Sequence, residues 1–157
     1  HDVSVPSPAG RTARVVGGVA ALVAVVDWGT KALATVTLDR APVEVGSLLT
    51  LRLSHNPGVA FGLGDRLPGP VVIGLTATVT AVLAVAAVRG FFPSRVAAGL
   101  VLGGAVANLV DRVLGGTVVD FLDLGWWPSF NGADVALSVG CVLLVLMSLR
   151  AESRQPV

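Results

Sequence analysis

Charged residues are scarce in this chain. Only 13% of its 157 residues are charged, against roughly 25% in a typical soluble domain. Hydrophobic residues make up 54% of the chain and the mean hydropathy is +0.81. This composition excludes an ordinary water-soluble fold and indicates a single integral membrane domain. With a net charge of only +1 and no run of basic residues, we expect no nucleic acid partner.

Cysteine and histidine are also scarce, which removes several kinds of site. Cys141 is the single cysteine, so the chain cannot form an internal disulfide. The only histidines are His1 and His55, and the absence of a His-Glu-x-x-His motif excludes a zinc metalloprotease of that type. The Gly-x-Ser-x-Gly motif is missing too, and no serine lies near Lys31 in sequence to form a Ser/Lys pair. We therefore expect no metal and no cofactor.

Four apolar segments are long enough to cross a bilayer as helices. We place these spans at about residues 15–38, 70–88, 96–114 and 133–149. Arg11 and Arg14 before the first segment would also suit a cleavable signal peptide, but the segment continues past Lys31, which favours a retained span. Residues 15–150 then form one membrane domain. Residues 1–14 are an N-terminal cytoplasmic tail or a cloning remnant, and residues 151–157 a C-terminal cytoplasmic tail.

Residues 42–63 differ from the apolar segments. Apolar and polar residues alternate along much of this region, which is typical of strands. Asn56-Pro57-Gly58 then indicates a turn, and residues 59–63 suit a short interfacial helix or strand. The predicted fold class is therefore a membrane all-α bundle of four transmembrane helices with a small extracytoplasmic β-element.

Three glycines lie within the third apolar segment, at Gly99, Gly103 and Gly104. Small residues let the backbones of neighbouring membrane helices approach closely. The third segment is therefore expected to pack tightly against another helix.

The arginines predict how the bundle is oriented. With four spans, six arginines flank the segments on the same side of the membrane: Arg11, Arg14, Arg89, Arg95, Arg150 and Arg154. An excess of positive charge marks the cytoplasmic side. Both termini would then be cytoplasmic. Because the third span runs outward and the fourth returns, Asp120 and Asp134 would emerge at the outer face, where Trp126-Trp127 between them suits the headgroup layer.

A polar stretch from Asn108 to Asp134 separates the last two apolar segments. Its carboxylates Asp120 and Asp134 are expected to meet at the same end of the bundle. Two carboxylates held close in a partly dehydrated place share a proton, so one can act as a base on water while the other donates to a carbonyl oxygen. Aspartic proteases use such a pair. The stretch therefore predicts a hydrolytic site that needs neither a metal nor a covalent nucleophile.

Structural explanations compete with this interpretation. Asn131 and Asp134 have the spacing of a helix N-terminus, where capping alone would favour both residues. Asp120 follows two valines and has no obvious helix to serve, so its structural alternative is a solvated loop residue.

Other polar residues within the spans also have structural explanations. Asp27 and Lys31 are one helical turn apart and can neutralise each other. Asn108, Asp111 and Arg112 lie on adjacent turns, so Asp111 and Arg112 can form a polar clamp between helices. We expect a structural role for Asp111.

Five short motifs, in order, resemble those of the lipoprotein signal peptidases, also called signal peptidase II. The resemblance covers nearly the whole chain after the N-terminal tail. Two positions depart from the family pattern, Trp28 where glutamine is usual and Ala107 where glycine is typical. The motifs are Asp27-Trp28-Gly29-Thr30-Lys31, Asn56-Pro57-Gly58-Val59-Ala60-Phe61, residues 103–112 ending in Asn108-Leu109-Val110-Asp111-Arg112, Val119-Asp120-Phe121, and Phe130-Asn131-Gly132-Ala133-Asp134.

This resemblance implies an aspartyl endopeptidase of the bacterial inner membrane. Such enzymes cleave signal peptides from prolipoproteins just before a cysteine that carries diacylglycerol, and globomycin-type cyclic peptides inhibit them. Membrane lipid and a diacylglyceryl prolipoprotein are thus the expected partners, with the active site near the outer face. Carried over by position, Asp120 and Asp134 would be the catalytic pair. The residues that would bind substrate or support the site are Asp27, Lys31, Asn56, Asn108, Arg112 and Asn131.

Three other interpretations remain. The acidic, amide and basic residues would suit a small proton- or cation-coupled transporter, although we find no internal repeat. A purely structural membrane subunit would not explain why the acids gather on one face. The string Gly62-Leu63-Gly64-Asp65 matches the short motif of another class of intramembrane aspartyl protease, but a plain turn explains it better.

Overall fold

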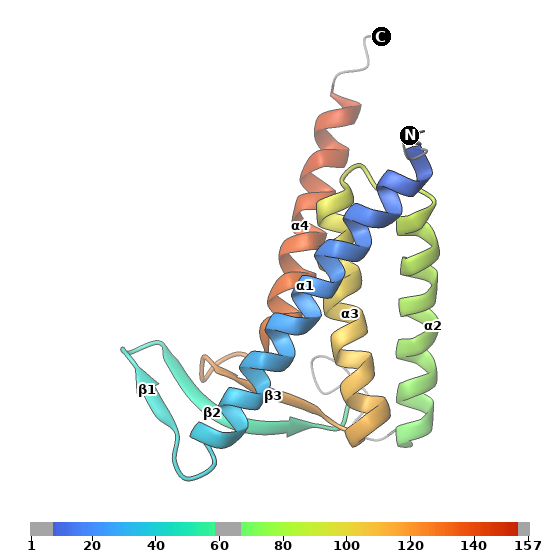
Figure 1. Cartoon of the computed structure of the whole chain (residues 1–157). Coiled ribbons are helices and arrows are strands. Elements are labelled where there is room, and N and C mark those ends of the chain that lie inside the picture. The colour runs from blue at the N-terminus through green and yellow to red at the C-terminus, as the bar shows by residue number, and fades with distance from the viewer. Residues whose placement is uncertain (1–7, 59–66, 154–157) are drawn as a thin grey trace, which may run out of the picture.

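The computed structural model describes residues 8–58 and 67–153, in which four helices and three strands are found. The helices are α1 (Pro8–Thr37), α2 (Gly69–Val88), α3 (Arg95–Gly115) and α4 (Gly132–Glu152). Each is long and apolar enough to cross a membrane. A small sheet lies at one end of the bundle, and α1 begins and α4 ends at the other end (Figure 1). The predicted bundle of four transmembrane helices with a small β-element is therefore confirmed.

Helix α1 begins earlier than the sequence analysis placed the first span. Residues 8–14, which we assigned to a tail, form its first two turns. Proline is well tolerated in the first turn of a helix because the first amide groups have no partner there, and Pro8 occupies that position. At the other end of the chain, α4 extends through residues 151 and 152, which we had also assigned to a tail.

Helix α3 is the centre of the bundle, and its glycines explain how closely its neighbours approach. A Cβ atom on Gly99 would lie 2.6 Å from Cβ of Val19, and one on Gly103 would lie 2.7 Å from Cβ of Val23, both on α1. A Cβ atom on Gly104 would collide with the backbone carbonyl oxygen of Ala133 on α4. The close packing expected from these three glycines is confirmed.

The outward faces of the helices are apolar. Every helix carries large hydrophobic side chains that are more than half exposed, although the central part of α3 has none. Examples are Leu22, Val25, Leu75, Val82 and Val142. In a soluble protein so many would be unusual. In a bilayer these apolar side chains face the hydrocarbon chains of lipid, where neither water nor a hydrogen-bonding group is present.

The sheet contains three antiparallel strands in the order β1 (Val43–Val45), β2 (Leu49–Asn56) and β3 (Val118–Asp123). The predicted β-element accounts for β1 and β2, whereas residues 59–63 lie outside the described residues. The sequence analysis predicted no strand at residues 118–123, and the structure corrects this. Ser54 of β2 pairs with Asp120 of β3, and an ion pair of 2.5 Å joins Arg52 to Asp123.

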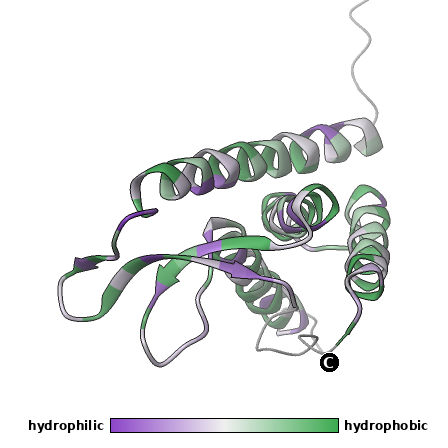
Figure 2. Ribbon diagram, turned by 90° about the horizontal axis from the view of Figure 1, so that it is seen from below, coloured by the Kyte–Doolittle hydropathy of each residue, from purple (hydrophilic) through white to green (hydrophobic). Residues whose placement is uncertain are grey.

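Seen from the sheet side, the strands run beside α1 and pass in front of α4 (Figure 2). Their ribbons mix hydrophilic and hydrophobic residues, whereas the helices are mainly hydrophobic. This arrangement places Asn56 of β2 and Asp120 of β3 beside the ends of α3 and α4. A site between them has walls from the sheet and from the membrane helices.

Candidate active site

A cavity of about 270 Å³ lies where the sheet meets the ends of α3 and α4. Asp120 from β3 and Asp134 from the first turn of α4 both line it. Asn56 of β2 and Asn108 and Arg112 of α3 contribute further polar groups to the same cavity. The structure therefore brings together the two carboxylates that the sequence analysis expected to meet.

Asp120 is almost completely buried, with 2% of its surface exposed. Its Oδ1 accepts a hydrogen bond of 2.7 Å from Nδ2 of Asn131, and its Oδ2 accepts one of 3.3 Å from Nδ2 of Asn56. Burial, and next the charge of Asp134, raise the pKa of Asp120 to about 6, against the opposing effect of these two amide donors. A solvated loop residue, the structural alternative, is therefore the wrong description of Asp120.

Asp134 is held at the start of α4 by a capping box. Its backbone N–H donates to Oδ1 of Asn131 at 3.0 Å, and its Oδ2 accepts from the backbone N–H of Asn131 at 3.1 Å. The capping expected for these two residues is therefore present. The other carboxylate oxygen, Oδ1, accepts a hydrogen bond of 2.8 Å from Nδ2 of Asn108. Capping thus fixes where the carboxylate lies without using all its oxygen lone pairs.

Two carboxamides connect the carboxylates. The side chain of Asn131, which is fully buried, donates both to Asp120 and to Oδ1 of Asn108, the latter at 3.2 Å. Asn108 in turn donates to Asp134. A continuous path of hydrogen bonds therefore joins Asp120 on β3 to Asn131 at the N-cap of α4, then to Asn108 on α3, and finally to Asp134 on α4. This path restricts both carboxylates to one arrangement.

An ionic cluster lies beside this path. Nζ of Lys31 is 2.5 Å from Oδ2 of Asp27, 2.6 Å from Oδ2 of Asp111, and donates to Oδ1 of Asn108 at 3.0 Å. The expected pairing of Asp27 with Lys31 is present, and Asp111 joins it from α3. Asp27 also accepts a hydrogen bond of 2.7 Å from the backbone N–H of Ala133. The cluster therefore ties α1 to α3 and to the start of α4.

Arg112 turns away from its neighbour Asp111. It donates from Nη2 to the carbonyl oxygen of Gly58 at 2.8 Å and from Nη1 to the carbonyl oxygen of Asn108 at 3.3 Å. The polar clamp expected for Asp111 and Arg112 is thus two separate contacts, because Asp111 reaches α1 and Arg112 reaches the end of β2. The contact to Gly58 holds the sheet against α3 at the edge of the cavity.

The sequence analysis missed the apolar wall of the cavity. Trp127, Phe130 and Leu137 line it opposite the polar groups. We had assigned Trp126-Trp127 to the headgroup layer, and these two rings meet edge to face with centroids 5.6 Å apart. Hydrophobic residues next to a span have no sequence signal that separates a lipid contact from a cavity wall.

The chemistry available here is that of carboxyl groups and water. Within the described residues no group of three or more His, Cys, Asp or Glu side chains is placed to hold a metal ion. A carboxyl with a pKa of about 6 next to a second carboxyl provides a proton donor and a proton acceptor in one cavity. Gly62-Leu63-Gly64-Asp65, the other motif considered, lies outside the described residues.

Comparisons with known proteins agree with this geometry. The profile of a family described as "Signal peptidase (SPase) II" matches residues 19–150. A lipoprotein signal peptidase of Moorella thermoacetica is 42% identical over 119 residues, which are 71% of this chain and 78% of that protein. One from Geobacter metallireducens is 38% identical over 154 residues, or 90% and 94% of the two chains. The corresponding protein of Rhodococcus jostii is 36% identical over 139 residues, or 83% and 70%.

Solved structures give the same result. Two bacterial membrane enzyme structures resemble the fold, one with a TM-score of 0.76 and 28% identity over 90% of this chain and 93% of the other. The second has a TM-score of 0.71 and 29% identity over 85% and 91%. With its four membrane helices, the protein is a multi-pass bacterial membrane protein and, as its relatives imply, a protease. The resemblance seen in the motifs is confirmed, and the chain belongs to the signal peptidase II family.

Proposed function

We propose that this protein is an aspartyl endopeptidase that removes signal peptides from diacylglyceryl prolipoproteins, cleaving just before the lipid-modified cysteine. Asp120 and Asp134 would be its catalytic pair. One observation carries the assignment: two carboxylates from separate elements line a single cavity, and hydrogen bonds through Asn131 and Asn108 connect them. The relatives' name, lipoprotein signal peptidase, supplies the substrate class.

In this mechanism the pair holds one proton. Asp120, with its pKa raised to about 6, is the acid and donates to the carbonyl oxygen of the scissile peptide. Asp134 is the base and takes a proton from a water molecule, whose oxygen bonds to the carbonyl carbon. The resulting gem-diol collapses when Asp134 returns its proton to the leaving nitrogen and Asp120 recovers a proton from a hydroxyl group. The C–N bond breaks, and the pair regains its starting state.

The neighbouring residues would position this pair. Asn108 and Asn131 provide neutral donors that orient both carboxylates without adding charge to the cavity. Asn56 donates to Asp120 from the sheet, and Arg112 holds the sheet against α3. Asp27 accepts a hydrogen bond from the backbone N–H of Ala133 at the start of α4, and Lys31 pairs with Asp27 and would hold it in place. Lys31 also limits the rise in the pKa of Asp120.

The proposed position in the membrane suits a lipid-anchored substrate. The cavity lies at the sheet-bearing end, and the positive-inside rule assigns that end to the outer face. A substrate embedded in the bilayer would reach the cavity sideways and lay apolar residues on the wall formed by Trp127, Phe130 and Leu137. Globomycin-type cyclic peptides would compete for the same cavity.

A gel-shift assay on a purified diacylglyceryl prolipoprotein tests the proposal. Asp120→Asn and Asp134→Asn should each lower the cleavage rate by at least about 100-fold, because each removes one proton-transfer group. Asp39→Asn, the same substitution on an exposed carboxylate at the same end of the bundle, is the matched control and should cleave normally. All three proteins should keep the melting profile of the native protein. Cleavage at the native rate by either catalytic variant would refute the assignment.

A further inference from the structure

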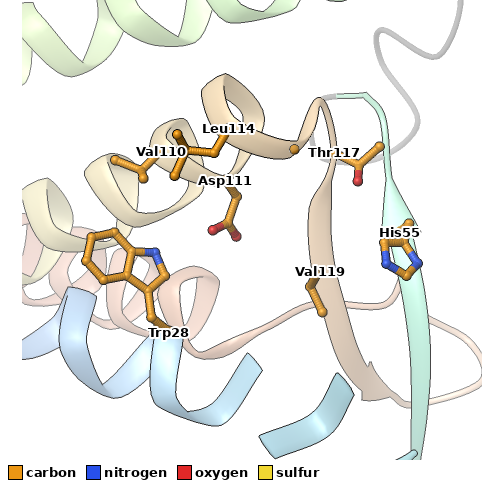
Figure 3. A pocket seen from close by; sticks show the side chains of 8 residues that line it. Trp28, His55, Val110, Asp111, Leu114, Thr117 and Val119 are labelled. Atoms are coloured by element: carbon orange, nitrogen blue, oxygen red, sulfur yellow. The ribbon is translucent and has the colours of Figure 1, made fainter. Parts of the chain in front are cut away.

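A second and larger cavity lies on the opposite face of the sheet from the candidate active site. Its volume is about 560 Å³, and residues of α1, α3, β2, β3 and the segment leading into β3 surround it. Figure 3 shows the carboxylate of Asp111 pointing into the space between Trp28 and Val119, with His55 and Thr117 on the strand side. None of these side chains lines the cavity that contains Asp120 and Asp134.

The two cavities occupy opposite faces of the same sheet. Successive side chains in a strand point to opposite faces. Asn56 and Asp120 accordingly line the first cavity, while their neighbours His55 and Val119 line the second. On α3, Arg112 lines the first cavity and Asp111 the second. The second cavity is therefore a separate site and not an extension of the first.

The second cavity has a negatively charged wall. Two carboxylates, Asp27 and Asp111, share the single ammonium group of Lys31, so the cluster carries a formal charge of −1. Asp27 and Lys31 are buried, with 1% and 5% of their side chains exposed, whereas 16% of Asp111 remains exposed. Asp111 is the member that lines the cavity, and none of the described lining residues is lysine or arginine. A cationic group in the cavity would complete the charge balance.

Most of the other residues that line the cavity are apolar, and the helix side of the cavity faces lipid. Trp28 is 39% exposed and Leu114 81% exposed at the edge of the cavity. One turn earlier on α1, Val25 is 65% exposed on the surface that faces the bilayer. Tryptophan is enriched where acyl chains meet headgroups. On the strand side, Thr117 and His55 carry side-chain groups that can donate hydrogen bonds to phosphate oxygens.

We propose that this cavity binds a membrane phospholipid whose headgroup carries a primary ammonium group. The ammonium group pairs with the carboxylate of Asp111, the phosphate lies toward Thr117 and His55, and the acyl chains run over Trp28 and Leu114. Anionic phospholipids without an amine are disfavoured because their charge has the same sign as the cluster. The site does not depend on the proposed peptidase activity, since binding can be measured without a substrate.

Native mass spectrometry of the detergent-purified protein tests the proposal. The probes are phosphatidylethanolamine and phosphatidylglycerol with identical acyl chains. We expect about fivefold tighter binding of phosphatidylethanolamine, as suits one partly exposed ion pair. Asp111→Asn neutralises the cluster and should abolish this preference, whereas the control Asp39→Asn should retain it. No preference in the native protein, or a preference that survives Asp111→Asn, would refute the site.

A second pair of variants keeps the test valid if Asp111→Asn fails to fold. Leu114→Lys places an ammonium group at the mouth of the cavity, where it can pair with Asp111. Val113→Lys makes the same change at the neighbouring exposed position, which does not line the cavity. Leu114→Lys should shift the preference toward phosphatidylglycerol, and Val113→Lys should not. Equal effects of the two variants would contradict the proposal. Glycerophosphoethanolamine has the same headgroup but lacks acyl chains, and it would also contradict the proposal if it competed as well as the intact lipid.

Discussion

Asn131 makes more of the site's contacts than any other single side chain described here. Its carboxamide oxygen caps α4, and its Nδ2 lies within hydrogen-bonding distance of Asp120, Asn108 and the carbonyl oxygen of Val119. The capping role could be predicted from the Asn131-x-x-Asp134 spacing because capping is local. The link to Asp120 could not, because it depends on a strand that pairs with residues far away in sequence.

In the proposed mechanism the pH dependence of cleavage follows from Asp120. Its pKa of about 6 means that Asp120 is protonated below this pH and ionised above it. Above this pH Asp120 has lost the proton that the proposed mechanism needs, so kcat/KM should fall as the pH rises through about 6. The measured value will belong to the coupled pair and not to either residue alone. A profile of kcat/KM against pH with a diacylglyceryl prolipoprotein measures it.

The variant Asn56→Ala tests whether Asp120 determines the pH at which kcat/KM falls. The amide of Asn56 donates to the carboxylate of Asp120 and lowers its pKa. Removing the donor should raise the pKa and move the fall in activity to higher pH. Thr50→Ala on the same strand, which pairs with Asp123 away from the cavity, is the control. A shift toward lower pH, or an equal shift in both variants, would show that Asp120 does not determine the profile.

At the scale of whole elements, the helices and the first two strands could be predicted but β3 could not. The helices follow from apolar segments long enough to cross a bilayer. Residues 118–123 are too few to give a clear alternating pattern, and their partner strand lies some 60 residues earlier. This strand matters for the site because it carries Asp120. The family motif located that residue, while its burial required the fold.

The contact between α3 and the start of α4 positions the second carboxylate. Gly104 lies so close to the carbonyl oxygen of Ala133 that a Cβ atom cannot be added without moving α4. Gly104→Ala should therefore destabilise the protein by about 1–3 kcal/mol, as overpacking commonly does. Because Asp134 is the next residue after Ala133, the same displacement should also reduce cleavage. Thermal unfolding in detergent and the gel-shift assay measure the two effects.

Gly74→Ala on α2 is the matched control for this variant. A Cβ atom at Gly74 meets nothing within 4 Å, and alanine forms helices better than glycine. This variant should match or slightly exceed the native melting temperature and should cleave normally. If Gly104→Ala behaved in the same way, the close contact between α3 and α4 would not be what fixes Asp134.

At the scale of the whole molecule, the buried charged residues of the described chain collect at one end of the bundle: Asp27, Lys31, Arg112 and Asp120. The candidate active site, the second cavity and the sheet all lie there, whereas α1 begins and α4 ends at the opposite end (Figure 1). A transporter would need a polar site near the middle of the membrane, between two related halves. In the described helices the buried polar cluster lies next to the sheet instead. This position is consistent with a signal peptidase II and not with a transporter.

This asymmetry allows the proposed orientation to be measured. In a Cys141→Ala background, Ser47→Cys places a single thiol on the exposed turn between β1 and β2, and Ser153→Cys places one after α4. The arginines flanking the helices assign the end that carries Ser153 to the cytoplasm. A membrane-impermeant maleimide should therefore label Ser47→Cys in intact cells, or in spheroplasts if an outer membrane blocks the reagent. Ser153→Cys should be labelled only after the membrane is permeabilised. The reverse pattern would place Asp120 and Asp134 on the cytoplasmic side, where a substrate exported through the membrane could not reach them.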